Sequence, residues 1–352
     1  MVGFQRSGTT LLQALLGAHS RIAAPPETHY LFRIAHLADY FGDLRDDASL
    51  RRALHDALFP PVPLFAGCGF DEDRIYQRAF AGPRTYGALL DAIMSDFADR
   101  HDKPRWSEKT PGQPLADVLH LWPDAQAIHI IRDPRLVVAS SKRVPWELMP
   151  PPRVAATWAS FTRANVQRGR AAGPRSYHEM RYEDLVADPE TVLRALCTFL
   201  DEEYEPSMVE DRRRRQHALP AVVSPWHRRV LDDIQAESPP PASVLTIFQR
   251  ARVAAKLGQL PAHLGYPSSR RGVLSVGRLL NVLALPASLP HFLERLRLRW
   301  DLRNPESHYR AAHRWMGGRV RSVQLVQAGT RTDAGLSPMS GIHPESPQLS
   351  DL

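Results

Sequence analysis

The segment Gly3-Phe4-Gln5-Arg6-Ser7-Gly8-Thr9-Thr10 has the spacing of a phosphate-binding loop, with two glycines five residues apart followed by hydroxyl side chains. A leucine-rich helical pattern over residues 9–18 follows at once, so backbone N–H groups and the positive end of that helix would converge on an anion. Loops that bind nucleoside triphosphates carry a lysine before the final hydroxyl, and Thr9 stands at that place. The loop therefore favours an anion with fewer charges, such as a single 5′-phosphate. Taken alone, its spacing also fits a glycine-rich turn before a helix.

Two later segments place cations next to predicted strand ends. Lys109 lies two residues before Pro111, which would end a strand and leave the lysine at the carboxyl edge of a sheet, where α/β proteins bind ligands. The apolar run of residues 127–131 predicts a buried strand that delivers Arg132 to the sheet edge, and Ser140 lies two turns along the following helix. An arginine with a hydroxyl is a good clamp for a second phosphate group. The alternatives are a surface lysine and a structural ion pair between the arginine and the aspartate after it.

Together these segments resemble the sulfotransferase family that uses 3′-phosphoadenosine 5′-phosphosulfate (PAPS) as donor, over roughly residues 2–205. The most specific match is Arg6-Ser7-Gly8-Thr9-Thr10-Leu11, which is similar to the 5′-phosphosulfate loop of the family. The pattern is most similar to the branch that contains bacterial sulfotransferases and tyrosylprotein sulfotransferases. The other matching positions are Arg132 and Ser140 for the 3′-phosphate clamp, and Tyr182-Glu183-Asp184-Leu185, Pro189 and Phe199-Leu200 for a later strand–helix signature.

The resemblance implies an α/β fold, a P-loop-type parallel β-sheet flanked by helices, with a helical C-terminal region. It also implies in-line transfer of a sulfuryl group from PAPS to a hydroxyl or amine, with Lys109 stabilising the charge of the leaving phosphate. No metal is required, because loop amides, a lysine and arginines can balance the charge of the donor. The implied donor site comprises Arg6, Ser7, Gly8, Thr9, Thr10, Arg132, Ser140 and, as a weaker candidate, Tyr182.

A general base should deprotonate the acceptor, and Glu27 is the first candidate, because the resembling branch carries a catalytic glutamate after its first helix. A carboxylate near Lys109 and a desolvated acceptor suits that task. The alternative is that Glu27 supports the start of a helix over residues 28–40. His29 is the second candidate base, since histidine serves in other sulfotransferases. Arg33 could meet an acidic acceptor, although a solvated helix face is the simpler expectation.

The elements that must position these side chains are strands that alternate with helices. This alternation favours a parallel sheet. Phosphate loops normally follow a strand of about five residues, but only Met1 and Val2 precede Gly3. We therefore expect a chain that starts several residues upstream to be more stable. The patterns predict strands over residues 127–131 and 176–181, and helices over residues 9–18, 27–40, 47–58, 85–100, 134–143, 153–170 and 189–200.

Composition changes suggest three regions. Residues 1–270 are expected to form the sulfotransferase domain, residues 271–327 a helical extension, and residues 328–352, rich in Gly, Ser, Pro and Asp, a disordered tail. The apolar stretch Val273–Leu289 predicts a helical cap over the core or, alternatively, contact with a membrane or lipid surface. Trp226 either covers the adenine or acceptor or packs in the core.

The composition excludes several classes of protein. Of 352 residues, 43% are apolar and 24% charged, which is the globular range rather than that of a disordered or collagen-like chain. The net charge of +7 favours anionic ligands. The cysteines, at positions 68 and 197, match no zinc or redox spacing. No signal peptide and no transmembrane run are visible, so we expect a cytoplasmic protein.

The sequence also allows two other classes of function. A P-loop kinase is the main alternative, disfavoured by Thr9 in place of the lysine. A nucleic-acid binder finds support only in the run Arg212–Arg215, which is more typical of a solvated helix face, so no nucleic-acid partner is expected. The acceptor, whether small molecule, carbohydrate, lipid or peptide, and the oligomeric state are not readable from the sequence.

Overall fold

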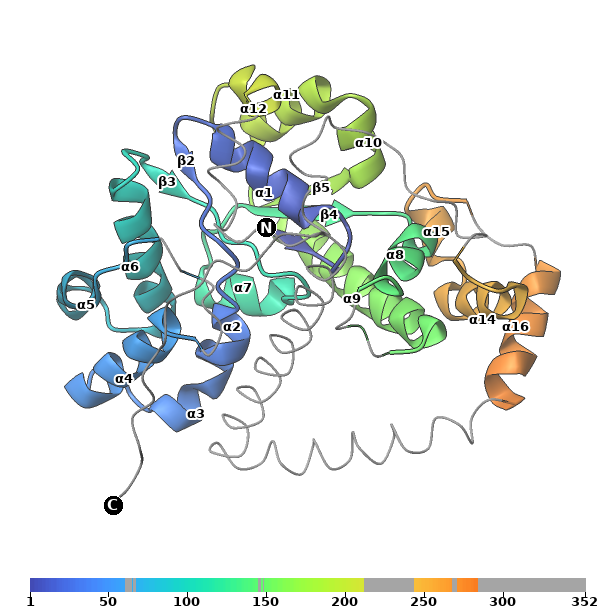
Figure 1. Cartoon of the computed structure of the whole chain (residues 1–352), viewed down its shortest axis with the longest axis horizontal. Helices are drawn as coiled ribbons and strands as arrows, with labels where there is room; N and C mark the ends of the chain where they lie inside the picture. Colours follow the sequence, from blue (N-terminus) through green and yellow to red (C-terminus); the bar gives the residue numbers. More distant parts are fainter. Residues whose placement is uncertain are drawn as a thin grey trace, which may run out of the picture.

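The protein is built around a parallel β-sheet with helices on both faces (Figure 1). This arrangement confirms the predicted fold class, a P-loop-type sheet flanked by helices, with further helices after residue 244. The structure is a computed structural model and describes residues 1–60, 65, 68–144, 147, 149–211, 244–267 and 271–283.

Within the described residues, three parallel strands form the central sheet, in the order β1-β4-β5. Gly3 lies opposite Ile130, and Ile131 lies opposite Arg181. The strands therefore end at one edge of the sheet, and the segments that follow them begin side by side. The strands are β1 (Val2–Gly3), β4 (Ala127–Ile131) and β5 (Tyr177–Arg181).

The side chains of β4 are buried on both faces of the sheet, which explains the uninterrupted apolar run of this strand. Ile128 and Ile130 pack with leucines of α1 and α11 on one face. On the other face, Ala127 packs with α7 and Ile131 with α8 and α9. The helices around the sheet are α1 (Thr9–Ala18), α7 (Leu115–Leu121), α8 (Pro134–Ser141), α9 (Pro151–Ala172), α10 (Tyr182–Ala187), α11 (Pro189–Phe199) and α12 (Ser207–Glu210). The predictions for α1, α8, α9 and α11 are confirmed to within a few residues.

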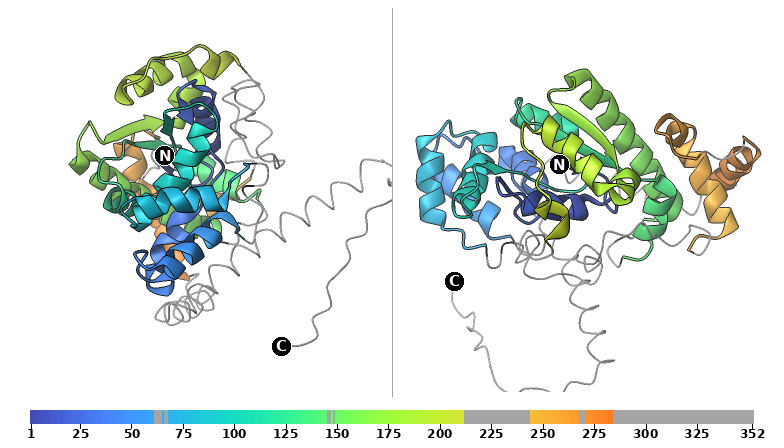
Figure 2. Two further views of the ribbon diagram at one scale, coloured as in Figure 1. Left: turned by 90° about the vertical axis from the view of Figure 1, so that its left-hand side faces the viewer. Right: turned by 90° about the horizontal axis from the view of Figure 1, so that it is seen from above.

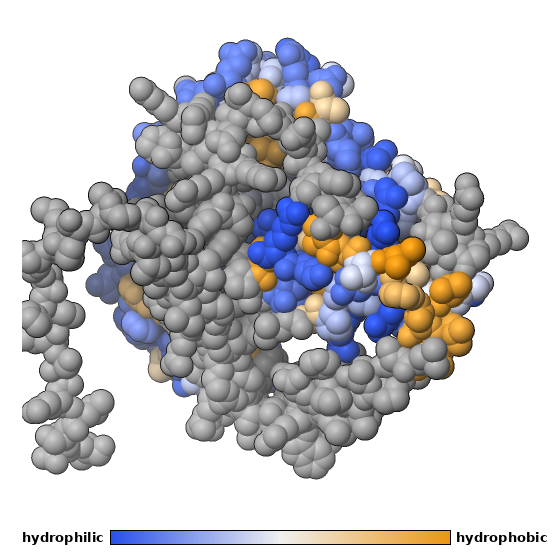
Figure 3. Space-filling model, turned by 45° about the vertical axis from the view of Figure 1, so that its right-hand side comes forward, coloured by the Kyte–Doolittle hydropathy of each residue, from blue (hydrophilic) through white to orange (hydrophobic). Residues whose placement is uncertain are grey.

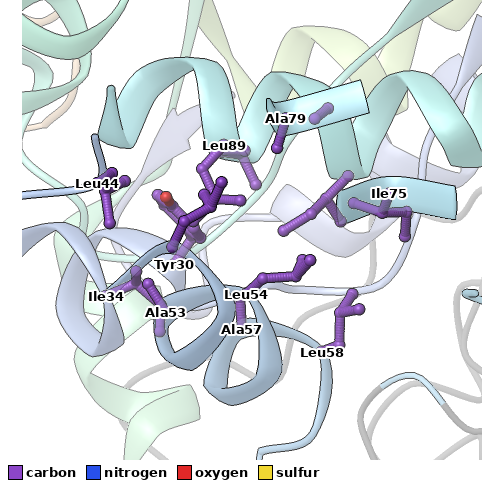
Figure 4. Close-up of a cluster of buried hydrophobic side chains, with 14 of the residues drawn as sticks. Tyr30, Ile34, Leu44, Ala53, Leu54, Ala57, Leu58, Ile75, Ala79 and Leu89 are labelled. Atoms are coloured by element: carbon purple, nitrogen blue, oxygen red, sulfur yellow. The ribbon is translucent and has the colours of Figure 1, made fainter. Parts of the chain in front are cut away.

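A helical lobe lies beside the sheet and has its own apolar core (Figure 4). Tyr30, Ile34, Leu54 and Ile75 meet there, contributed by helices far apart in the sequence. The lobe contains α2 (Tyr30–Arg33), η1 (Ala35–Leu37), α3 (Ala38–Phe41), α4 (Asp47–Leu58), α5 (Glu72–Ala81) and α6 (Tyr86–Asp99). The predictions for α4 and α6 are confirmed, whereas α5 and α7 were not predicted.

The single helix predicted over residues 27–40 is wrong, because the structure has three short helical pieces that begin only at Tyr30. The backbone changes direction at Ile34, whose φ is −119°. Tyr30, Ile34, Leu37 and Phe41 keep the three- and four-residue spacing of a helix and all enter the core of the lobe. The apolar residues therefore enter the core as the pattern predicted, but tertiary packing divides the predicted helix into three pieces.

A second, two-stranded sheet joins β2 (Ile22–Ala23) to β3 (Arg105–Trp106) in parallel. Its last bond runs from Ser107 N–H to the Ala23 carbonyl, at 2.8 Å. β3 thus ends five residues before Pro111, so the prediction that Pro111 ends this strand is wrong. Beyond Ser107, side-chain hydrogen bonds replace the backbone ladder, as described below.

Three helices at the end of the molecule opposite α4 and α5 complete the described chain (Figure 2). They are α14 (Ile247–Leu257), α15 (Leu260–His263) and α16 (Arg271–Leu283). α14 packs against α9 through Val253 and Leu257. Within the described residues, no helix combines the length and apolar character needed to cross a bilayer. The division into three regions stays a prediction, and residues 284–352, with the predicted tail, lie outside the described residues.

Candidate functional site

The loop between β1 and α1 turns at two residues with left-handed backbone conformation. Arg6 has a φ of 67° and Gly8 a φ of 94°. A Cβ atom on Gly8 would lie 2.2 Å from the Tyr182 ring, so only glycine fits at this position. α1 then begins at Thr9 with no side-chain cap from the described residues, and its first-turn N–H groups face the loop. Ser7 Oγ is buried and has no hydrogen-bond partner in the described part of the chain. These groups form a cradle suited to an anion.

The basic clamp after β4 contacts this loop directly. Arg132 Nη1 donates to the Arg6 carbonyl at 2.9 Å, and Arg6 Nε donates to Ser140 Oγ at 3.1 Å. The Arg132 guanidinium also lies 4.2 Å from the ring centroid of Tyr182. Residues that follow three different strands therefore meet at one edge of the sheet, as ligand sites of α/β proteins do.

Burial lowers the pKa of Arg132, because desolvation penalises its positive charge, and the nearby Tyr182 and Glu183 oppose this effect. Hydrogen bonds that involve Glu183 and Tyr266 support the segment after β4 that carries Arg132. Glu183 Oε1 accepts a hydrogen bond from Asp133 N–H at 2.9 Å, and the Tyr266 hydroxyl donates to Glu183 Oε2 at 3.0 Å. The C-terminal helical region thus helps to hold a partly desolvated cation at the sheet edge.

Lys109 and Glu27 form an ion pair beside the phosphate loop. Lys109 is almost fully buried, and its Nζ donates to the Glu27 carboxylate and to Thr10 Oγ1, the latter at 3.1 Å. The pair forms because β2 and β3 are parallel neighbours, with Ala23 opposite Trp106. The segments after both strands therefore leave the small sheet in the same direction.

Glu108 ties these two segments together. Its carboxylate accepts hydrogen bonds from Thr28 Oγ1 at 2.8 Å, from Thr110 Oγ1 at 2.6 Å and from Gln113 Nε2 at 2.8 Å. Thr110 Oγ1 in turn accepts a hydrogen bond from His29 N–H at 3.0 Å. The role of Glu108 could not be predicted from the sequence, because its three hydrogen-bond donors come together only in the folded chain.

Replacing Glu108 by glutamine is expected to lower the free energy of unfolding by about 1–3 kcal/mol, because the amide nitrogen cannot accept the hydrogen bonds that one carboxylate oxygen now accepts. Chemical denaturation of the two proteins measures this difference. Glu190→Gln on α11 is the matched control. Its exposed ion pair with Arg194 predicts a change below about 1 kcal/mol. Equal losses in both variants would show that Glu108 does not hold the segments together.

The structure places both candidate bases together. His29 Nε2 lies 3.4 Å from Glu27 Oε2, and the His29 backbone is left-handed, with a φ of 51°. The solvated face expected for Arg33 is wrong, because Arg33 is 2% exposed and donates to the Thr28 and Asp56 carbonyls. Its position at the bend after α2 turns the side chain inward.

All ten residues of the predicted catalytic and donor sites lie in the described chain, around the ends of β1, β4 and β5 and the two segments after β2 and β3. Trp226 and Arg212–Arg215 lie outside the described residues. Tyr266 and Glu183 were not predicted as supports of the clamp, because Tyr266 is far from it in the sequence. No group of His, Cys, Asp and Glu in the described chain has the arrangement of a metal site.

A phosphate-type loop between β1 and α1, with a basic clamp after β4, defines a P-loop-type α/β protein. A sequence model of the Sulfotransferase family matches residues 1–206. The match covers more than half of the chain, and the protein therefore belongs to the sulfotransferase family. Membership of this family supports a transferase activity.

The chain is also similar, at low sequence identity, to individual proteins. Protein-tyrosine sulfotransferase A of Caenorhabditis elegans is 26% identical over 207 residues, which cover 56% of this chain and 48% of that protein. The chain thus matches about half the length of this relative. Among solved structures, the sulfotransferase domains of the Synechococcus PCC 7002 olefin synthase and of the curacin biosynthetic pathway are 23% and 20% identical. Each aligns over 76% of this chain, and over 94% and 97% of its own, with a TM-score of 0.49.

Proposed function

We propose that the protein transfers a sulfuryl group in line from PAPS to a hydroxyl or amine acceptor. The observation that carries this proposal is the contact of the Lys109 ammonium with both the Glu27 carboxylate and Thr10 Oγ1. This contact joins a cation, a carboxylate and the end of an anion-binding loop in one place. Such a grouping suits a reaction in which charge develops on a leaving phosphate while an acceptor loses a proton.

The residues of the site fit a bisphosphorylated donor. The Ser7 hydroxyl, which has no hydrogen-bond partner among the described residues, and the first-turn amides of α1 could donate hydrogen bonds to a 5′-phosphosulfate. Arg132 and Ser140 are assigned to the 3′-phosphate, and Tyr182 to the wall of the same site. When bound, the donor would supply the sulfuryl group; the loop, the clamp and Lys109 would hold it and balance its charge without a metal ion.

Lys109 and Glu27 have complementary roles in this proposal. The Lys109 ammonium would turn from the carboxylate toward the leaving oxygen and stabilise its negative charge. The Glu27 carboxylate would then be able to accept the proton of the acceptor hydroxyl. Because Lys109 is buried, its charge would act with little screening by water. The similarity to a protein-tyrosine sulfotransferase supports a peptide or small-molecule acceptor.

Calorimetric titration with 3′-phosphoadenosine 5′-phosphate (PAP), compared with Mg-ATP, tests the donor. We expect PAP to bind more tightly than Mg-ATP, because only PAP carries the 3′-phosphate that Arg132 would hold. Arg132→Ala should weaken PAP by about 10- to 100-fold, the value of a hydrogen-bonded charge pair of about 1.5–3 kcal/mol. Arg194→Ala, which removes an equal charge from the exposed side of α11, should leave PAP affinity unchanged.

A preference for Mg-ATP over PAP would assign the protein to the phosphotransferases. Equal PAP affinities of Arg132→Ala and the unaltered protein would remove Arg132 from the donor site.

A further inference from the structure

The end of the molecule formed by α14 and α16 exposes a cluster of large apolar side chains (Figure 3). Each of its five residues is between 54% and 67% exposed. Only two other large apolar side chains in the described chain are exposed, Phe59 at 56% and Phe80 at 44%, and both belong to the helical lobe at the opposite end. We call this surface the α14–α16 face, and it consists of Ile247, Phe248, Val276, Leu279 and Val282.

The outward direction of the α16 side chains is set by how α16 packs. Gly277 faces α14 so closely that a Cβ atom there would lie 1.9 Å from the Ala251 carbonyl oxygen. Asn281, one turn further, accepts a hydrogen bond from Arg252 Nε and donates one to the Arg252 carbonyl, both at 3.1 Å. Since residues 277 and 281 face α14, Leu279 and Val282 must lie on the opposite side of the helix. Their exposure is therefore a consequence of the helix pairing.

The charged side chains of the two helices that form this face have one sign. Arg250, Lys256 and Arg278 are exposed on the same two helices. From residue 238 to residue 293, the sequence contains six Lys or Arg residues and no Asp or Glu. No carboxylate of these helices can therefore neutralise the cations, although the chain as a whole has 38 acidic residues.

We propose that the α14–α16 face docks on a bilayer surface that contains anionic lipid. Apolar side chains that enter the interface, together with Lys and Arg at their margin, are the features by which amphipathic helices bind such surfaces. Docking of a second copy on the same face would bring two sets of the cations Arg250, Lys256 and Arg278 into one interface, because a two-fold interface pairs identical patches. A nucleic acid would match the cations but leave the five apolar side chains unsatisfied.

Flotation of the full chain with phosphatidylcholine vesicles, with and without phosphatidylglycerol, tests this proposal. We expect partitioning at least about tenfold stronger to the vesicles with phosphatidylglycerol, and a loss of that difference at high salt. Leu279→Glu and Arg278→Glu should each reduce partitioning about tenfold or more. Phe80→Glu on α5, 44% exposed, is the matched control and should partition like the unaltered chain. Thermal melting of each variant verifies that it is folded.

Three results would overturn the proposal. These are equal partitioning to both kinds of vesicle or to neither, partitioning of Leu279→Glu and Arg278→Glu that equals that of the unaltered chain, and a concentration-dependent dimer that Leu279→Glu abolishes. The last result would assign the face to a second copy of the chain. Should Leu279→Glu fail to fold, Arg278→Glu, whose side chain is exposed, still decides between the outcomes.

Discussion

Replacing Lys109 by alanine is expected to lower turnover about 10²- to 10³-fold, on the scale of a lost oxyanion donor. The reason is the position of its ammonium, buried beside Thr10 at the end of the phosphate loop, where a developing negative charge would meet little competing water. PAP affinity should change less, because the loop amides and Arg132 remain. Initial rates of transfer from PAPS to an acceptor found by a screen of phenols, sugars and amines measure the effect, and calorimetry measures PAP binding.

Two further variants distinguish a catalytic role of Lys109 from a general effect of removing a positive charge. Arg194→Ala removes an equal charge from the exposed side of α11 and should retain the full rate. Lys109→Arg should restore little activity, since a planar guanidinium does not replace a compact ammonium in a buried contact. A full rate for Lys109→Ala would contradict the assignment of Lys109 to the leaving phosphate.

Glu27→Gln is expected to lower turnover about 10²- to 10⁴-fold, the range attributed to general acid–base catalysis. Glutamine keeps the size of the side chain but cannot take a proton from the acceptor. PAP binding should be preserved, because Glu27 touches Lys109 and His29 rather than the Arg132 clamp. The same rate assay, run at saturating PAPS, measures the loss in turnover.

His29 provides the comparison that identifies the base. Its imidazole lies 3.4 Å from the Glu27 carboxylate, so either group could reach an acceptor placed beside the pair. We expect His29→Asn to reduce turnover less than about tenfold. Full activity of Glu27→Gln together with a large loss in His29→Asn would move the role of base to His29.

Local patterns predicted the central sheet well, because its elements are stabilised by what their own residues bury. The run at 127–131 is short and is buried on both faces, as the predicted strand requires, and Pro134 begins the next helix where the pattern placed it. Short strands were harder to predict from the sequence. β2 and β3 have two residues each, too few to show a period of hydrophobicity, and each exists because the other pairs with it.

The residues of the site likewise divide into those that follow recognisable strands and those that meet only through contacts between distant segments. Arg132 and Tyr182 directly follow strands that could be recognised, so their approach to the phosphate loop follows from parallel topology. The meeting of Glu27 with Lys109 depends on the pairing of β2 with β3, which joins segments 82 residues apart. The network of Glu108 depends on the same pairing, whereas the inward turn of Arg33 depends on the packing of α4, whose Asp56 carbonyl accepts a hydrogen bond from it.

The fold class and the resemblance to sulfotransferases could be read from the sequence, as could the glycine-rich loop after β1 and the basic residues after β4, because each is encoded by residues close together in the chain. The sequence did not show that Lys109 is buried against Glu27, that Glu108 connects the two segments, or that α14 and α16 expose apolar side chains. These features arise from contacts between distant segments. Their geometry depends on which helices and strands pack together, and no local pattern of residue types contains that information.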